Sequence, residues 1–286
     1  MEHLPVEYFE KLDAEAWLLS PPCQPFTRGG KRMDDEDPRS TGFLHLLNVL
    51  GKMKNPPRYI FLENVLNFEI SRTHGRMIEV LRTLGFRVEE YLVEPTDPWV
   101  GIPNARLRYY LAATRLLSAD SGNYTGHIYR SFEEVLGPAP SQTIRPISEF
   151  LEAEADADPK YLVPLRYLTD YKNYRHDIKQ PSSLSSTTFT KAYGSKHIIG
   201  TGSFLQTRRL SLEYACDDSE VLVTLGLRFF TPREIARLHG LPMDGPHAFH
   251  FHSSTSLAQQ YKLLGNSMNI KVVALILKRL FTINQL

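Results

Sequence analysis

The chain has 286 residues, enough for one large or two modest domains with a proper hydrophobic core. Its composition, 42% hydrophobic and 23% charged, is that of an ordinary globular protein, without repeats or low-complexity tracts. A net charge of +1 excludes a strong overall attraction to nucleic acid, so any such partner must be bound by local basic patches.

Two cysteines, Cys23 and Cys216, exclude a disulfide framework and have no metal-ligand spacing around them. This favours a reducing compartment, and we expect the protein in the cytoplasm, with the nucleus as a second location. The apolar run 272–277 is too short to cross a bilayer, and the start of the chain is neither basic nor apolar enough for a signal peptide. We expect a soluble monomer without a membrane partner or a metal.

The first 115 residues alternate between helical and strand patterns. In chain order they predict a helix or turn within 5–16, a strand over 16–19, a helix over 43–50, a strand over 58–62, a helix over 77–84, a strand over 88–93, and a strand over 106–111 after the loop 94–105. Strands that alternate with helices predict a parallel α/β sheet.

From residue 116 to 216 this alternation fades. The segment is rich in Ser, Thr, Tyr, Gly and Pro, and 187–195 and 200–204 resemble short strands and turns, as in a small mixed or β-rich domain. Helical signals return at Thr231, where Pro232 and Glu234 complete a capping box, and 256–259 repeat that signature. A last helix with an apolar face follows 265–267.

The stretch 18–27 places one cysteine at the carboxyl end of an apolar strand. Pro21 and Pro22 fix φ and remove two backbone donors, so the strand must end there. Ligands of open α/β sheets bind at this end, which makes Cys23 a candidate nucleophile. An inert buried cysteine is the alternative for Pro-Pro-Cys alone.

The densely charged segment 27–40 follows that cysteine directly. It is either a solvated connection, as most charged loops are, or an active-site lid with arginines such as Arg28 that contact phosphates. Its position beside the thiol favours the lid.

Four short motifs occur in order at strand or helix boundaries: Pro21-Pro-Cys-Gln24, Glu63-Asn-Val65, Arg106-Leu-Arg108 and Gly265-Asn-Ser267. Together they strongly resemble the cytosine-5 methyltransferase family. The resemblance implies a Rossmann-like methyltransferase sheet with a small mixed or β-rich target-recognition domain. It also implies S-adenosylmethionine as the methyl donor.

The chemistry of that family explains these residue types. Position 5 of cytosine is too electron-poor to take a methyl group until a thiolate adds at position 6, a role that fits Cys23. The resemblance assigns the proton at ring N3 to Glu63. Arg106 and Arg108 alternate on one strand and point to opposite faces, and by resemblance Arg108 binds O2 in the pocket with Arg106 nearby. The target base must be swung out of a helix or lie in a loop.

Within the family, the closest likeness is to the tRNA-directed branch. The recognition region is short, 188–194 with 200–202 resemble that branch's Cys-Phe-Thr signature, and 228–234 also match it. The resemblance implies cytosine-38 in the anticodon loop of a tRNA of the tRNA-Asp type as the target. It implies substrate contacts from Arg28, Thr188, Phe189, Thr190 and Lys191. Thr188 replaces the signature cysteine, so Cys23 is the only nucleophile in a matching motif.

The front of the chain departs from the family pattern. Members begin with a strand and a glycine-rich turn for the cofactor, whereas this sequence reaches Pro21 at once. By resemblance, Ser20 and Ser267 are the cofactor contacts that remain, so we expect impaired binding of S-adenosylmethionine. The strand 16–19 lacks its family neighbours and becomes an edge. We expect an incomplete gene model, a splice form or a decayed copy.

We expect three parts: a catalytic α/β domain at 1–115, a target-recognition region at 116–230, and C-terminal helices at 231–286 that pack on the catalytic domain. One alternative keeps the reaction but makes DNA the substrate, which the short recognition region disfavours. Another is a catalytically dead tRNA-binding protein. A cysteine hydrolase is disfavoured because neither His45 nor His74 lies in a recognisable partner motif.

Overall fold

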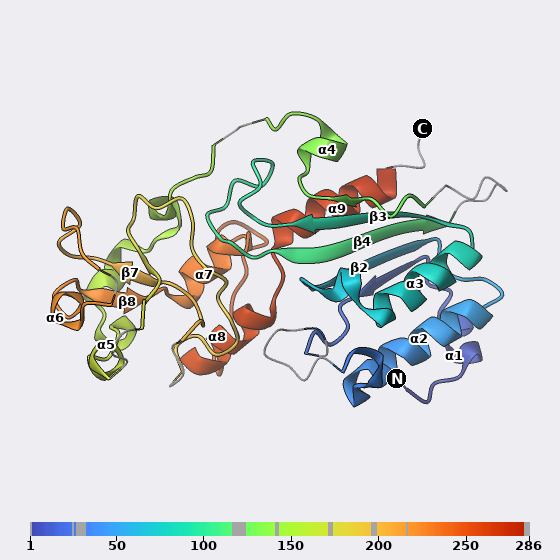
Figure 1. Cartoon of the computed structure of the whole chain (residues 1–286), viewed down its shortest axis with the longest axis horizontal. Coiled ribbons are helices and arrows are strands. Elements are labelled where there is room, and N and C mark those ends of the chain that lie inside the picture. Colours follow the sequence, from blue (N-terminus) through green and yellow to red (C-terminus); the bar gives the residue numbers. More distant parts are fainter. Residues whose placement is uncertain are drawn as a thin grey trace. The chain divides into compact units, whose positions relative to one another are not determined.

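The computed structural model describes residues 2–24, 26, 33–115, 124–140, 143–170, 174–195, 199–215 and 217–282. The chain forms two compact units (Figure 1). Unit 1 consists of Met1–Val93, Leu107–Pro138 and Ala274–Leu286, and unit 2 of Glu94–Arg106 and Ala139–Val273. This division differs from the predicted three parts, since residues 231–273 group with unit 2 and not with the segment predicted to be catalytic.

Unit 1 is built on a five-stranded sheet with the order β1-β2-β4-β3-β5. Its strands are β1 (Ala16–Leu19), β2 (Tyr59–Val65), β3 (Phe86–Val93), β4 (Arg108–Arg115) and β5 (Ile128–Tyr129). β1 runs parallel to β2, and β3 parallel to β5, whereas β4 is antiparallel to both of its neighbours. The prediction of a parallel sheet is therefore wrong. The connection from β3 to β4 contains no helix, and antiparallel pairing needs no helical crossover.

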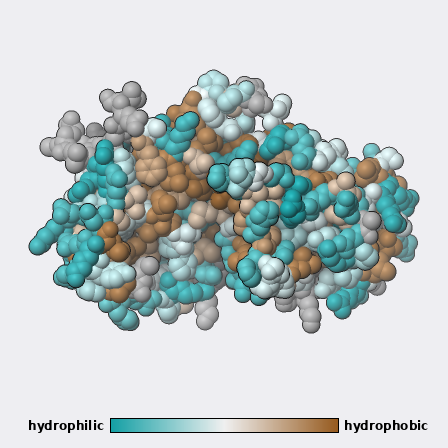
Figure 2. Space-filling model, turned by 180° about the vertical axis from the view of Figure 1, so that it is seen from behind, coloured by the Kyte–Doolittle hydropathy of each residue, from teal (hydrophilic) through white to brown (hydrophobic). Residues whose placement is uncertain are grey.

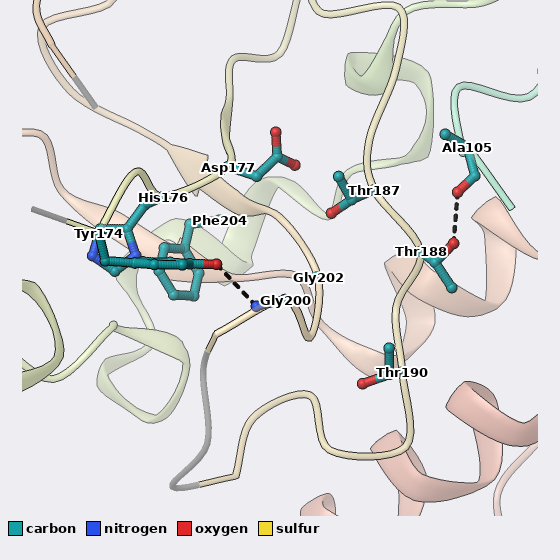
Figure 3. A pocket seen from close by; sticks show the side chains of 10 residues that line it. All are labelled: Ala105, Tyr174, His176, Asp177, Thr187, Thr188, Thr190, Gly200, Gly202 and Phe204. Atoms are coloured by element: carbon teal, nitrogen blue, oxygen red, sulfur yellow. Dashed lines mark hydrogen bonds between the residues drawn. The ribbon is translucent and has the colours of Figure 1, made fainter. Parts of the chain in front are cut away.

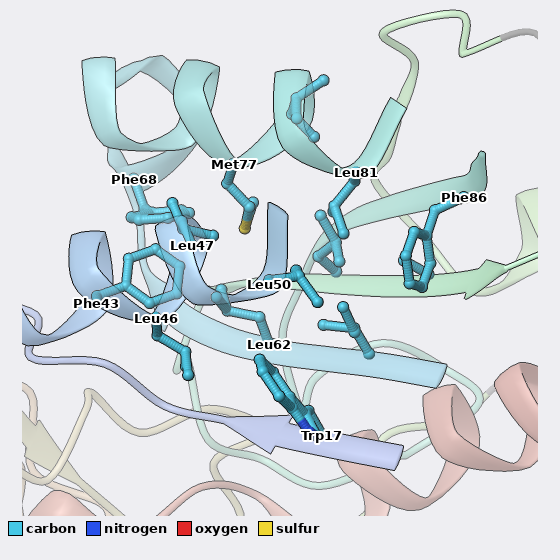
Figure 4. Close-up of a cluster of buried hydrophobic side chains, with 14 of the residues drawn as sticks. Trp17, Phe43, Leu46, Leu47, Leu50, Leu62, Phe68, Met77, Leu81 and Phe86 are labelled. Atoms are coloured by element: carbon cyan, nitrogen blue, oxygen red, sulfur yellow. The ribbon is translucent and has the colours of Figure 1, made fainter. Parts of the chain in front are cut away.

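Helices cover both faces of this sheet. The predicted helices within 43–50 and 77–84 are confirmed as α2 (Thr41–Lys52) and α3 (Arg72–Thr83), and α1 (Val6–Leu12) precedes β1. Their apolar stripes pack on one face against inward side chains such as Trp17 and Leu62 (Figure 4). On the other face, Tyr59 packs edge-to-face against Phe281 of α9 (Ile270–Thr282), with ring centroids 5.0 Å apart.

Two neighbouring acidic residues of β3 cross-link unit 1. Arg279 of α9 donates to both carboxylate oxygens of Glu89, at 2.7 and 2.8 Å. Glu90 accepts from Tyr109 at 2.7 Å, from Tyr124 at 2.5 Å and from the His74 ring at 2.5 Å. Burial raises the pKa of Glu90, but these hydrogen bonds outweigh burial and the net pKa is lowered. The ionised carboxylate is therefore a structural centre of unit 1.

Unit 2 has a small sheet of β6 (Ile178–Lys179), β7 (Phe204–Gln206) and β8 (Leu227–Phe229) in that order. Its longer helices are α7 (Pro232–Leu238) and α8 (Leu257–Asn266), and both predicted capping boxes are confirmed. Of the short strands and turns predicted at 187–195 and 200–204, the first segment has a turn at 191–194, where Tyr193 N donates to Thr190 O at 3.0 Å, but no strand, and β7 begins at the end of the second. Three short α-helical turns are also described: α4 (Glu133–Leu136), α5 (Arg166–Thr169) and α6 (Ser219–Leu222).

Hydrophilic side chains cover much of the surface shown in Figure 2, and hydrophobic ones form separate patches between them. Among the residues that the structure describes, no helix is both long and apolar enough to span a bilayer. Within the same residues, no three His, Cys, Asp or Glu side chains are grouped so that they could hold a metal ion.

Candidate active site

The cysteine turn leaves the carboxyl end of β1 and is fastened at two points. Cys23 is a free, half-buried thiol, and its carbonyl accepts from Phe26 N at 3.0 Å. The Phe26 ring is buried and meets Phe68 edge-on, with centroids 5.0 Å apart. Asn64 Nδ2 lies 3.5 Å from Pro21 O, at the long limit of a hydrogen bond. The thiol is thus held beside the end of β2.

Glu63 lies on β2 between a hydroxyl and a guanidinium. The parallel register pairs Leu19 with Leu62, which brings Ser20 level with Glu63. Ser20 Oγ donates to Glu63 Oε2 at 2.8 Å, and Arg108 Nε lies 3.6 Å from Glu63 Oε1. Glu63 is only 9% exposed. The carboxyl group is therefore oriented by two partners, one directly after β1 and one at the start of β4.

Arg39 is a cation near the thiol that the sequence interpretation missed. Its guanidinium donates to both oxygens of the buried Asp37, at 2.8 and 2.6 Å. The pKa of Arg39 is raised, first by this hydrogen bond and to a smaller extent by its electrostatic interaction with Cys23. A thiolate at Cys23 is therefore within the field of Arg39. Asp-Pro-Arg at the end of the charged segment was the available signal.

The structure assigns Arg106 and Arg108 to different surroundings. Because β4 begins at Arg108, Arg106 precedes the strand, and the prediction that the two alternate along one strand is wrong. Arg106 belongs to unit 2, is buried, and donates to the carbonyls of Phe189 at 3.2 Å, Gly265 at 3.2 Å and Ser267. The carbonyl oxygens fix its guanidinium there. Its predicted catalytic role has no support from these contacts.

Gly265 packs against the backbone of the recognition segment 188–191. A Cβ on Gly265 would lie 2.1 Å from Lys191 N and 2.2 Å from the carbonyl carbon of Thr190, so only glycine fits. Two residues later, Ser267 Oγ donates to Leu264 O at 2.8 Å and lies 2.8 Å from His239 Nδ1. The Ser20 and Ser267 hydroxyls thus have partners within the protein, and their cofactor contacts stay predictions.

The recognition segment presents some of its side chains and buries one. Thr188 Oγ1 donates to Ala105 O at 2.7 Å, and Lys191 is exposed. The Phe189 ring is 1% exposed and packs against Tyr193 and Phe230, so the predicted contact between this ring and a substrate is not available in this conformation. Phe189 anchors the segment because its ring belongs to the core of unit 2. Arg28 lies outside the described residues.

A cavity of about 270 Å³ adjoins the open edge of β1. Its described lining is apolar except for the Ser20 hydroxyl: Leu18, Leu19, Ser20, Pro21, Pro22, Gly42, Phe43 and Leu46. No charged side chain belongs to this lining. The cavity therefore suits an uncharged, flat or aliphatic group.

Comparisons with known proteins agree with this arrangement. The sequence pattern of the family described as C-5 cytosine-specific DNA methylase matches residues 6–282. The human protein named tRNA (cytosine(38)-C(5))-methyltransferase is 33% identical over 343 aligned residues, covering 98% of this chain and 85% of the relative. A Dictyostelium discoideum protein named DNA (cytosine-5)-methyltransferase is 35% identical over 318 residues, covering 100% of this chain and 82% of the relative.

A solved structure shows the same fold. The crystal structure of the S. pombe Dnmt2 methyltransferase matches with a TM-score of 0.78 and 34% identity, and the match covers 98% of this chain and 82% of that one. The family pattern and these similarities extend over nearly the whole chain. The chain therefore belongs to the C-5 cytosine-specific DNA methylase family and is an enzyme of the methyltransferase type.

Proposed function

We propose that this chain methylates ring position 5 of a cytosine in tRNA, at position 38 of the anticodon loop in a tRNA of the tRNA-Asp type. The observation that carries the proposal is Glu63, buried beside the end of the Cys23 turn and held between Ser20 and Arg108. The name of the human relative supports tRNA as the substrate. The protein's location in the cytoplasm and its monomeric state stay predictions.

In the proposed reaction, the Cys23 thiolate forms a bond to ring carbon 6 of cytosine. The electrons of the 5,6 double bond move into the ring, ring N3 takes a proton from Glu63, and carbon 5 becomes nucleophilic. Arg108 offers a guanidinium to the charge on O2. After carbon 5 has been substituted, loss of its hydrogen as a proton expels the thiolate and restores the double bond. Ser20 keeps the carboxyl group of Glu63 in one orientation.

The family in general uses S-adenosylmethionine, which supplies the methyl group. This donor carries a carboxylate, an ammonium and a sulfonium, whereas the described lining of the cavity beside Ser20 carries no charge. The residues that line this cavity therefore fit only an uncharged part of the donor. We propose that this chain binds S-adenosylmethionine weakly, and a micromolar Kd by calorimetry would contradict that.

Exchange of the hydrogen at carbon 5 tests the cysteine chemistry without the donor. Addition of the thiolate lets carbon 5 take a proton from water, and elimination then releases the original hydrogen. A tRNA with tritium at position 5 of cytosine should therefore lose tritium to water with the native chain and not with Cys23→Ala. Glu63→Gln should slow the release by about a hundredfold or more.

The same substitution at the other cysteine, Cys216→Ala, is the matched control and should release tritium at the native rate. Equal release of tritium by the native protein and by Cys23→Ala would refute the proposed mechanism. If the native chain released no tritium, a tRNA-binding protein without catalytic activity would be the better description of it.

The second candidate substrate is DNA, because the Dictyostelium relative is named a DNA methyltransferase. Bisulfite sequencing of tRNA and genomic DNA from cells with and without the gene separates the two. We expect loss of methylation at one tRNA cytosine. Loss confined to genomic DNA would overturn the choice of tRNA.

A further inference from the structure

Unit 2 contains a cavity that the proposed chemistry does not use. Its volume is about 390 Å³, within the range of small-ligand sites. Figure 3 shows Tyr174, His176 and Phe204 gathered at one side, and a chain segment with Thr188 and Thr190 at the other. Gly200 and Gly202 also line it; a Cβ on Gly202 would lie 2.6 Å from the Tyr193 ring, so that position needs glycine for packing.

The first side is an aromatic wall. The Tyr174 and His176 rings meet edge-on with centroids 4.9 Å apart, and the His176 and Phe204 rings are tilted by 34° at 5.6 Å. Gly200 N donates to the Tyr174 hydroxyl at 3.0 Å, which fixes that ring (Figure 3). Of the three rings, half-buried Tyr174 can offer a face to a flat ligand, whereas His176 and Phe204, 4% and 2% exposed, support that ring through their mutual contacts.

His176 contributes to this wall a ring nitrogen, Nε2, for which the described residues offer no hydrogen-bond partner. Its side chain lines the cavity although the residue is only 4% exposed, and its buried Nε2 has no hydrogen-bond partner among the described residues. Burial lowers the pKa of His176, so the neutral ring offers Nε2 as one donor or one acceptor. A buried unpaired nitrogen costs free energy, and a ligand in the cavity reaches Nε2 only if the ring turns toward it.

Asp177 adds a fixed acceptor to the lining. Lys179 Nζ lies 2.8 Å from its Oδ1, and Ser203 donates to Oδ2. Burial raises the pKa of Asp177, but these contacts outweigh it and the net pKa is lowered, so the carboxylate is ionised at neutral pH. Each carboxylate oxygen has a further lone pair that can accept from an N–H group.

We propose that this cavity binds a second, unpaired nucleobase of the same RNA whose cytosine is the target. A base has the required flat faces and a polar edge with N–H groups, and single-stranded bases are commonly held by aromatic side chains. Thr188 and Thr190 of the recognition segment line the cavity, so a ligand here lies against that segment. The inference rests on the proposed function for the identity of the RNA.

Abasic RNA tests the proposal. Anticodon stem-loops are prepared with one abasic residue at each loop position except the target cytosine, and their Kd values are measured by fluorescence anisotropy. With the native chain, one abasic position should raise Kd by between about fivefold and a hundredfold, as expected for a lost stacked base. His176→Leu should weaken binding of the intact RNA, and the same abasic change should then have less than a twofold further effect.

Stability separates binding from a structural role. His176→Leu replaces an unpaired buried polar group with an apolar one, so the melting temperature should stay equal or rise while RNA affinity falls. Asp177→Asn, which keeps the shape but removes the charge, is the second variant and should also weaken binding. His252→Leu, at an exposed histidine of the same unit, is the matched control and should bind RNA like the native chain.

Native affinity in both His176→Leu and Asp177→Asn would overturn the inference, as would equal effects of all abasic positions. Failure of the native chain to bind the stem-loop would overturn it together with the choice of RNA. If the abasic RNAs gave the expected pattern but the chain released no tritium from cytosine, the proposed reaction would be refuted and the base-binding cavity would still be supported.

Discussion

Gly265→Ala tests how closely the 265–267 loop and the recognition segment depend on each other. Gly265 is the penultimate residue of α8, with helical and not left-handed backbone, so its own conformation does not require glycine. Helix propensity by itself predicts that alanine stabilises this position by up to about 1 kcal/mol. The packing predicts the opposite, because the added Cβ would lie 2.1 Å from Lys191 N.

The packing effect should prevail. Ordinary carbon contacts begin near about 3.5 Å, so the two backbones must separate by more than about 1 Å. The atoms in the way are backbone, which cannot rotate aside as the end of a side chain can. Overpacking typically costs about 1–3 kcal/mol. Taking the upper part of that range and subtracting the helical gain leaves a net loss of about 2 kcal/mol.

Thermal unfolding followed by calorimetry measures this difference. A loss of about 2 kcal/mol should lower the Tm of a unit of this size by about 4–8 °C. Gly75→Ala in α3 is the matched control, since a Cβ there would meet nothing within 4 Å, and its Tm should rise. If Gly265→Ala melts at or above the native temperature, the contact with the recognition segment is not as close as described.

Three further changes test separate contacts. Arg106→Met removes the donor to three backbone carbonyls, so it should lower the free energy of unfolding by about 3 kcal/mol and with it the urea midpoint. An unchanged midpoint would show that these hydrogen bonds do not stabilise the fold. The pKa of Glu90 is lower in the folded chain than its ordinary value of 4.5, so the ionised carboxylate stabilises the fold. This contribution is fully present at pH values above 4.5 and is lost as pH falls through the lowered pKa. Glu90→Gln should therefore lower Tm most at pH 7 and by less as pH falls below 4.5, and an equal lowering at every pH would refute this. Ser20→Ala should slow tritium release by about threefold to tenfold, and a native rate would show that Ser20 does not orient Glu63.

Local patterns predicted the elements of the fold but not the direction of every strand. The helical spacing of apolar residues located α2 and α3, and the Thr231 and Ser256 capping boxes were correct because both are completed within four residues. The direction of β4 depends on how the chain returns from β3, and strand periodicity contains no such information. Similarly, the carbonyls that fix Arg106 lie far along the chain, beyond the reach of a strand pattern.

The candidate site was predictable where topology dictates proximity. Parallel pairing of β1 with β2 brings the Cys23 turn and Glu63 to the same edge of the sheet, as sequence order suggested. The partner of Ser20, the charge of Arg39 near the thiol and the unpaired nitrogen of His176 depend on tertiary packing. Short-range patterns carry no signal for these, apart from the residue types themselves.

The residues of the proposed reaction and those of the proposed base-binding cavity lie in different units of the chain. Cys23, Glu63 and Arg108 are all in unit 1, whereas the recognition segment 188–191 and the cavity around His176 are in unit 2. Changes at Glu63 or Arg108 should therefore alter the rate of tritium release at saturating RNA and leave RNA affinity nearly native. Changes confined to unit 2 should mainly alter that affinity, because each unit has its own core and its own network of hydrogen bonds.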